Sequence, residues 1–105
     1  NVHERMTLLK ELCPQLNSKH SKNAKQVCLL YYSVAKSDPS IDKSIVFDAT
    51  FQLARYYYLN HYYKKALPLY DECVAISKVT AIPREMLGAV ERCRKEIQAE
   101  LGDQK

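Results

Sequence analysis

The chain has 105 residues, of which 47% are hydrophobic and 27% are charged, and it contains only two glycines and four prolines. This length suits one domain, and the composition is too apolar for a disordered tail and too poor in turn residues for an all-β sandwich. The formal net charge of +4 is mild beside that of dedicated nucleic-acid-binding proteins. The run of about 18 apolar residues that a membrane-spanning helix needs does not occur, so no membrane partner is expected.

Helical periodicity accounts for most of the chain, because apolar residues recur at three- and four-residue intervals. In the first periodic segment, residues 3–16, Pro14 should kink the helix or end it. Ser21 is the expected N-cap of the second helix, and Asp38 followed by Pro39 is the expected start of the third. The expected breaks between helices lie near residues 17–22, 37–40, 60–62 and 79–83.

Four cysteines, at positions 13, 28, 73 and 93, show no C-x-x-C spacing, and the histidines at positions 3, 20 and 61 lie at no ligand-like interval from them. We therefore expect no metal site and no other cofactor. Each cysteine falls on the apolar face of an expected helix, where a thiol behaves as a small hydrophobic group. This pattern is typical of a reducing compartment, so we expect the protein in the cytoplasm or the nucleus.

The stretch from Phe51 to Ile76 reads FQLARYYYLNHYYKKALPLYDECVAI and resembles a tetratricopeptide repeat (TPR), a 34-residue helix-turn-helix unit. The segment CLLYYSVAKSDP from Cys28 parallels ALPLYDECVAIS from Ala66 and suggests an earlier, degenerate copy. The ladder of small and large residues that carries the resemblance consists of Leu53, Ala54, Tyr57, Ala66, Tyr70 and Cys73.

The periodicity and the resemblance together predict an all-α fold of antiparallel helical hairpins, stacked as a short right-handed TPR-like array of about five helices. Another α-helical bundle is the alternative. We expect a single domain over residues 1–105, with the best repeat match at 47–80, a degenerate hairpin at 3–37 and a C-terminal capping helix at 83–101. The capping role follows from the polar outer face of that last helix.

Catalytic patterns are not found in the sequence. It has no Ser–His–Asp spacing, no Gly-rich phosphate loop and no H-E-x-x-H motif. Asp71 and Glu72 are adjacent on an expected helix and therefore point about 100° apart, which does not suit a shared proton. We expect the protein not to be an enzyme.

In tetratricopeptide repeats the first helix of each hairpin lines the concave binding surface, and the resemblance places that surface on one stripe of residues. We expect a non-catalytic protein–protein interaction module, a scaffold or adaptor, that binds a helix or extended peptide of another protein, of the parent chain or of its own copy. Arg55 and Tyr58 are the expected anchors, since an arginine offers five donors and a tyrosine a stiff amphipathic surface. The plainer alternative is that Arg55 only pairs with Asp48 or Asp71. The expected partner-binding stripe is Asp48, Gln52, Arg55, Tyr58 and Leu59.

Two other functions remain open at this point. Between Glu11 and Asp38 the chain has no acidic residue, and with Arg55 and exposed tyrosines its lysines would form an RNA-binding or single-strand-binding helical repeat. A solvated surface is the plainer interpretation of these charges. The third function is a dimerisation or scaffold domain within a larger protein. The candidate basic patch is Lys19, Lys22 and Lys25.

Overall fold

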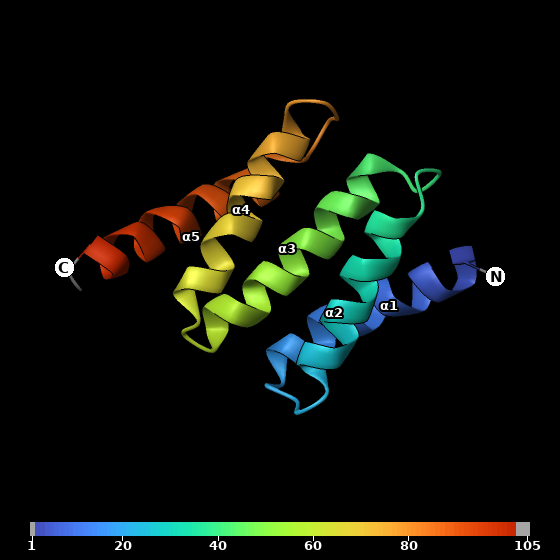
Figure 1. The fold of residues 1–105 in the computed structure, drawn as a ribbon, viewed down its shortest axis with the longest axis horizontal. Helices are drawn as coiled ribbons and strands as arrows, with labels where there is room; N and C mark the ends of the chain where they lie inside the picture. Colours follow the sequence, from blue (N-terminus) through green and yellow to red (C-terminus); the bar gives the residue numbers. More distant parts are fainter. Residues whose placement is uncertain (1, 103–105) are drawn as a thin grey trace.

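The computed structural model of the chain describes residues 2–102, and within them it contains five α-helices and no β-strand. Consecutive helices are antiparallel and joined by short turns, so the all-α fold of helical hairpins is confirmed (Figure 1). The helices are α1 (Val2–Ser18), α2 (Ala24–Ser37), α3 (Lys43–Leu59), α4 (Tyr63–Ser77) and α5 (Arg84–Gly102).

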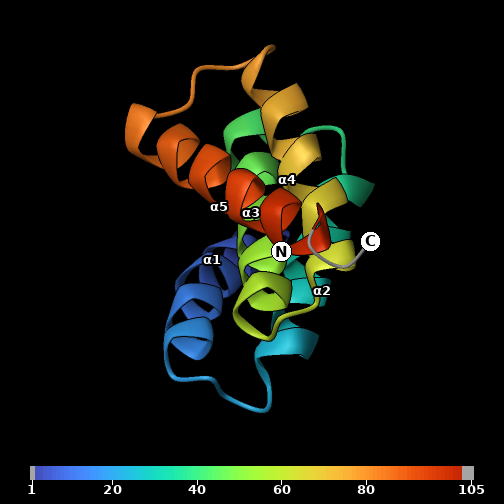
Figure 2. The ribbon, with the colours of Figure 1, turned by 90° about the vertical axis from the view of Figure 1, so that its left-hand side faces the viewer.

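The helices form two layers, with α1, α3 and α5 in one and α2 and α4 in the other (Figure 2). The central helix α3 packs against each of the other four helices, and its most extensive contact is with α4. The first and last helices lie at opposite ends of the longest dimension of the molecule, which measures 47 Å (Figure 1). This arrangement makes α3 the one described helix that contacts all the others, while α1 packs mainly on α2 and α5 mainly on α4.

The core consists of two clusters that meet at α3. The first cluster joins α1, α2 and α3 and includes Cys13, Tyr31 and Leu53. The second joins α3, α4 and α5 and includes Ala66 and Ile97, which are fully buried. Small residues at such contacts let two helix backbones approach closely, while the larger side chains fill the space between helix pairs.

Pro14 does not end α1, which continues through it to Ser18. Proline removes one helical hydrogen bond, but the residues on either side of it are held by packing. Cys13 is fully buried, and the Asn17 side chain, buried one turn later, donates through Nδ2 to the backbone oxygen of Gln52 at 3.1 Å. Tertiary contacts with α3 therefore hold the last turn of α1 in place.

Two expected helix starts are wrong. Helix α2 begins after Asn23, while the Ser21 Oγ accepts the Asn23 N–H inside the preceding turn. Helix α3 begins after Asp42, whose carboxylate accepts the backbone N–H of Ser44 at 2.8 Å. The Asp38 carboxylate instead accepts the N–H of Ser40 and closes a local turn. That turn directs the buried side chain of Ile41 toward the first core cluster before the helix begins.

The turns after α1 and α3 are built alike, since each places a histidine in the left-handed region, His20 with φ 50° and His61 with φ 64°. Each turn has the two backbone bonds of a Schellman motif. The Ser21 N–H bonds to Leu16 O after α1, and the Tyr62 N–H bonds to Tyr57 O after α3. Glycine normally takes this position, so two histidines hold it at the cost of some backbone strain.

Three side chains depart from the expected burial pattern. Leu12 belongs to the apolar periodicity of residues 3–16 but is exposed, as is Leu8 one turn before it. Tyr31 rather than Tyr32 is the fully buried tyrosine of α2, although the sequence parallel pairs Tyr32 with the buried Tyr70. Cys93 is only half-buried, because α5 packs on one side only.

Candidate interaction surface

The expected stripe on α3 is divided by contacts with other helices. At its beginning, Asp48 is half-buried and accepts the Tyr31 hydroxyl of α2 at 2.6 Å. Desolvation, followed by this bond and by the charge of Asp48, raises the pKa of Tyr31. Asp48 is therefore part of the packing between α2 and α3, and its carboxylate is already engaged.

Gln52 is more deeply buried than a binding residue on an open surface would be, with 6% of its area exposed. Its backbone oxygen accepts the Asn17 amide, while its side-chain Oε1 is buried and has no hydrogen-bond partner among the described residues. A buried amide oxygen without a partner costs free energy. Gln52 therefore belongs to the packing between α1 and α3 and not to an open surface.

Arg55 lies one turn after Gln52 and is partly buried. It belongs to α3, the helix that contacts both α2 and α5. It pairs with neither of the two expected carboxylates. Asp48 accepts from Tyr31, and the carboxylate of Asp71 pairs with Arg94 Nε at 2.8 Å.

Among the residues that the structure describes, we find no counter-ion and no hydrogen bond for the Arg55 guanidinium. A partly buried arginine without such a partner is an unusual feature in a folded protein.

Tyr58, the second expected anchor, is held by its own chain. Its hydroxyl donates to the Glu96 carboxylate of α5, and this bond, together with burial, raises the pKa of Tyr58 to about 12. Its ring packs edge to face against Tyr70 and obliquely on Tyr63, while Leu59 is half-buried. Tyr58 and Leu59 therefore tie α3 to its neighbours, and Arg55 alone of the stripe keeps an unpaired polar group at the surface.

The expected basic patch lies where α1 turns into α2, with Lys19, Lys22 and Lys25 all exposed. A polar pocket of about 170 Å³ opens beside it. From the α1–α2 side the pocket is lined by Asn17, His20, Ser21, Lys22 and Ala24, and from α3 by Tyr56 and Asn60.

A second group of cations, which was not among the expected binding residues, lies at the same end of the molecule. A pocket of about 280 Å³ at the start of α4 is lined by His61, Tyr63, Lys64 and Lys65, together with Tyr62 and Leu101. The Lys65 Nζ lies 5.7 Å and 5.8 Å from the ring centres of Tyr57 and Tyr62. The signal was present as the pair Tyr-Tyr followed by Lys-Lys, but only the fold shows that this pair lies beside the α1–α2 turn.

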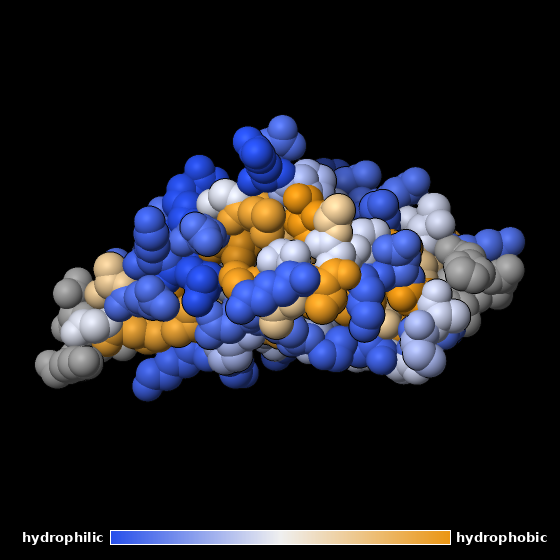
Figure 3. All heavy atoms as spheres, turned by 90° about the horizontal axis from the view of Figure 1, so that it is seen from above, coloured by the Kyte–Doolittle hydropathy of each residue, from blue (hydrophilic) through white to orange (hydrophobic). Residues whose placement is uncertain are grey.

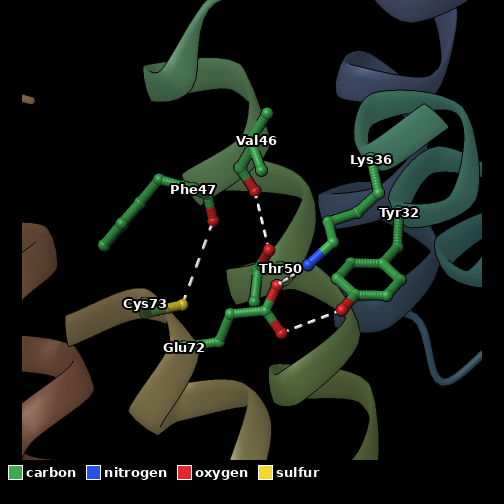
Figure 4. Close-up of polar contacts among 7 residues, drawn as sticks. All are labelled: Tyr32, Lys36, Val46, Phe47, Thr50, Glu72 and Cys73. Atoms are coloured by element: carbon green, nitrogen blue, oxygen red, sulfur yellow. Dashed lines mark hydrogen bonds and ion pairs between the residues drawn. The ribbon is translucent and has the colours of Figure 1, made fainter. Parts of the chain in front are cut away.

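A different arrangement joins α2 and α4 across α3. Glu72 of α4 accepts the Tyr32 hydroxyl at 2.8 Å and forms an ion pair with Lys36, both of α2 (Figure 4). In the same region Thr50 bonds back to the Val46 oxygen. These contacts fix the spacing of the α2 and α4 layer.

The end of the molecule that carries the α2–α3 and α4–α5 loops is less charged at its centre. Seen from above, apolar atoms gather there inside a hydrophilic rim (Figure 3). A pocket of about 370 Å³ at this end is lined by Ile41, Val46, Ile76 and Val79 among others, with the Lys36–Glu72 pair at its edge.

Neither a metal site nor a membrane-spanning helix is found in the part of the chain that the structure describes. Residues 2–102 contain no group of three or more His, Cys, Asp or Glu side chains placed to hold a metal ion. None of the described helices combines the length and the hydropathy needed to cross a membrane. Comparison of the chain with protein-family models, curated proteins and solved structures gave no significant match.

Proposed function

We propose that this chain is a non-catalytic protein-interaction module, built as a TPR-like array of hairpins, that binds an acidic segment of a partner protein at the middle of α3. The observation that carries this proposal is Arg55, a partly buried guanidinium without a counter-ion among the described residues. A partner carboxylate would supply the counter-ion that Arg55 lacks.

The proposal narrows the set of binding residues expected from the sequence. Asp48 accepts a hydrogen bond from Tyr31, and Tyr58 donates one to Glu96, so we give both residues a structural role. Arg55 remains as the anchor. The four free cysteines agree with a role in a reducing compartment, the cytoplasm or the nucleus.

The test starts from peptides selected on the wild-type protein from a random 12-residue display library. We expect the selected peptides to share an Asp or Glu. We expect Arg55→Gln to weaken their binding at least about tenfold by isothermal titration calorimetry, as for an anchor residue. Arg84→Gln, which removes the same charge from an exposed site at the start of α5, should leave binding unchanged. If both variants bind equally well, Arg55 is not the anchor and the proposal fails.

A further inference from the structure

A group of lysines lies at the end that carries the α1–α2 and α3–α4 turns, shown at the lower side of Figure 1. We name the lysines of this end the basic end face. All five are exposed, and none forms an ion pair with any residue that the structure describes. The basic end face consists of Lys19, Lys22, Lys25, Lys64 and Lys65.

The α3–α4 turn links the two groups of lysines. The pocket beside Lys22 is lined on its far side by Asn60, and the pocket beside Lys64 and Lys65 is lined by His61. Because Asn60 and His61 are consecutive, both pockets border the α3–α4 turn. Neither pocket has an acidic residue in its lining.

The lack of acidic residues in the two turns at this end follows from the sequence once the topology is known. The chain has no Asp or Glu between Glu11 and Asp38, and none between Asp48 and Asp71. These two intervals contain the α1–α2 and α3–α4 turns with the helix ends that flank them. The acids of α5 bound the surface on one side, where Glu96 already engages the Tyr58 hydroxyl.

Aromatic rings lie among these cations. Tyr62 is 54% exposed, although its ring packs edge to face on Tyr57. Tyr63 lines the same pocket, and its hydroxyl lies 2.9 Å from His61 Nδ1. An exposed ring beside lysines suits a base that stacks while its phosphates meet the cations, whereas an acidic peptide would use the lysines alone.

From this juxtaposition we propose that the basic end face is a binding surface for single-stranded nucleic acid. The lysines from the two turns contact successive phosphates, and Tyr62 stacks on a base. The surface does not include Arg55, so it is separate from the protein-binding site proposed above. Binding needs no particular base sequence, since every base has a face that an aromatic ring can contact.

The test measures the binding of fluorescein-labelled 12-nucleotide oligouridylate and oligothymidylate to the full chain by fluorescence anisotropy at several salt concentrations. If five phosphates are neutralised, the plot of log K against log salt should have a slope of about −3.5. Lys64→Gln with Lys65→Gln should reduce that slope by about 1.4. Equal affinity for the two strands would show that the 2′-hydroxyl is not read, and tighter binding of the uridylate would assign the surface to RNA.

The matched control removes two lysines from the opposite end, through Lys43→Gln with Lys78→Gln, and should leave affinity and slope nearly unchanged. Tyr62→Ala should weaken binding about tenfold without a change in slope, because it removes stacking and no charge. Circular dichroism and thermal melting verify that each variant is folded. The proposal is overturned if the control pair weakens binding as much as the Lys64 and Lys65 pair, or if a 12-residue oligoglutamate binds as tightly as the oligonucleotides.

Discussion

The two ends of this helical array differ in the charge of the residues at their helix N-termini, which is acidic at one end and basic at the other. Helices α1, α3 and α5 begin at one end, and each has an acidic group there, namely Glu4, the N-cap Asp42 and Glu85. Acidic groups suit these positions because the N-terminus of a helix carries a partial positive charge. At this end, the acidic groups therefore stabilise the helices that begin there.

Helices α2 and α4 begin at the other end, and their N-termini lack such acidic groups. Neither has an acidic residue in its first turn, and neither N-cap residue, Asn23 or Tyr62, makes a side-chain capping bond. Lys25, Lys64 and Lys65 lie in these first turns instead. Each cation at such a position disfavours the helix, so stability alone does not explain the second end. The difference supports a ligand of negative charge as the reason for the basic end face.

Both ends depend on the same packed core, and the substitution with the largest expected effect on stability tests this core. Ala66 is fully buried in the second core cluster, on the α4 helix that packs most extensively on α3. We expect Ala66→Leu to lower the free energy of unfolding by about 1–3 kcal/mol, because an overpacked core must shift backbone or side chains.

The matched control for this substitution is Ala99→Leu, at an exposed position of α5, which should change stability by less than about 0.5 kcal/mol. Urea unfolding measures both variants. Equal stabilities of the two variants would mean that α4 does not pack closely on α3 through Ala66.

The acid-capped end is tested next, at the start of α3. The Ser44 backbone N–H and hydroxyl both donate to Asp42, and these bonds hold the pKa of that carboxyl below its usual value. We expect Asp42→Ala to lower the melting temperature by several degrees and Asp42→Asn to restore most of the loss, since asparagine is also a good N-cap.

The pH dependence of this contribution has a definite sign. A carboxyl whose pKa is lowered by folding stabilises the protein above its ordinary pKa, and that stabilisation is lost as the pH falls through the lowered value. The difference in melting temperature between wild type and Asp42→Ala should therefore be full above about pH 4 and shrink in stronger acid. A difference that stays constant down to pH 2 would contradict the role of the ionised cap.

The smallest expected effect concerns the basic end and has the opposite sign. Lys64→Glu should raise the free energy of unfolding by about 0.3–1 kcal/mol, because it places an acid at the N-terminus of α4. Lys78→Glu makes the same charge change at the C-cap of that helix and should lower stability by a similar amount.

Urea unfolding at low ionic strength measures this pair of variants, and 1 M salt should reduce both effects. The same Lys64→Glu protein should bind single-stranded nucleic acid more weakly than wild type does. A loss of stability in Lys64→Glu would remove the contrast between the two ends.

The helices could be predicted from the sequence because their apolar spacing is local information. Two helix starts could not, since Asp38 and Ser21 carry the same chemistry as true caps but form turns of their own. The competing cap, Asp42, is followed two residues later by Ser44, which completes its bonds. Pro14 was misleading in another way, because the packing of Asn17 against α3 outweighs the missing hydrogen bond.

The candidate binding residues were harder to predict, because their partners lie far away in the sequence. Asp48 accepts from a tyrosine 17 residues earlier, and Tyr58 donates to a glutamate 38 residues later. Spacing along α3 showed that these residues share a stripe, but it could not show which of them would form hydrogen bonds with side chains of other helices. Lys64 and Lys65 likewise lie at the same end as the lysines of the α1–α2 turn only because the fold places both turns there, which the sequence spacing could not show.

The bridge from α2 to α4 gives the array a preferred direction of bending. Tyr32 and Lys36 hold Glu72 across α3 in one layer, whereas in the opposite layer we find no contact between α1 and α5 within the described residues (Figure 4). A deformation that separates α2 from α4 must stretch this bridge. One that spreads α1 from α5 meets no bond that joins those two helices directly, although each of them is bonded to α3. We therefore expect the molecule to bend more easily by moving α1 and α5 apart, in the layer that contains Arg55, than by separating α2 from α4.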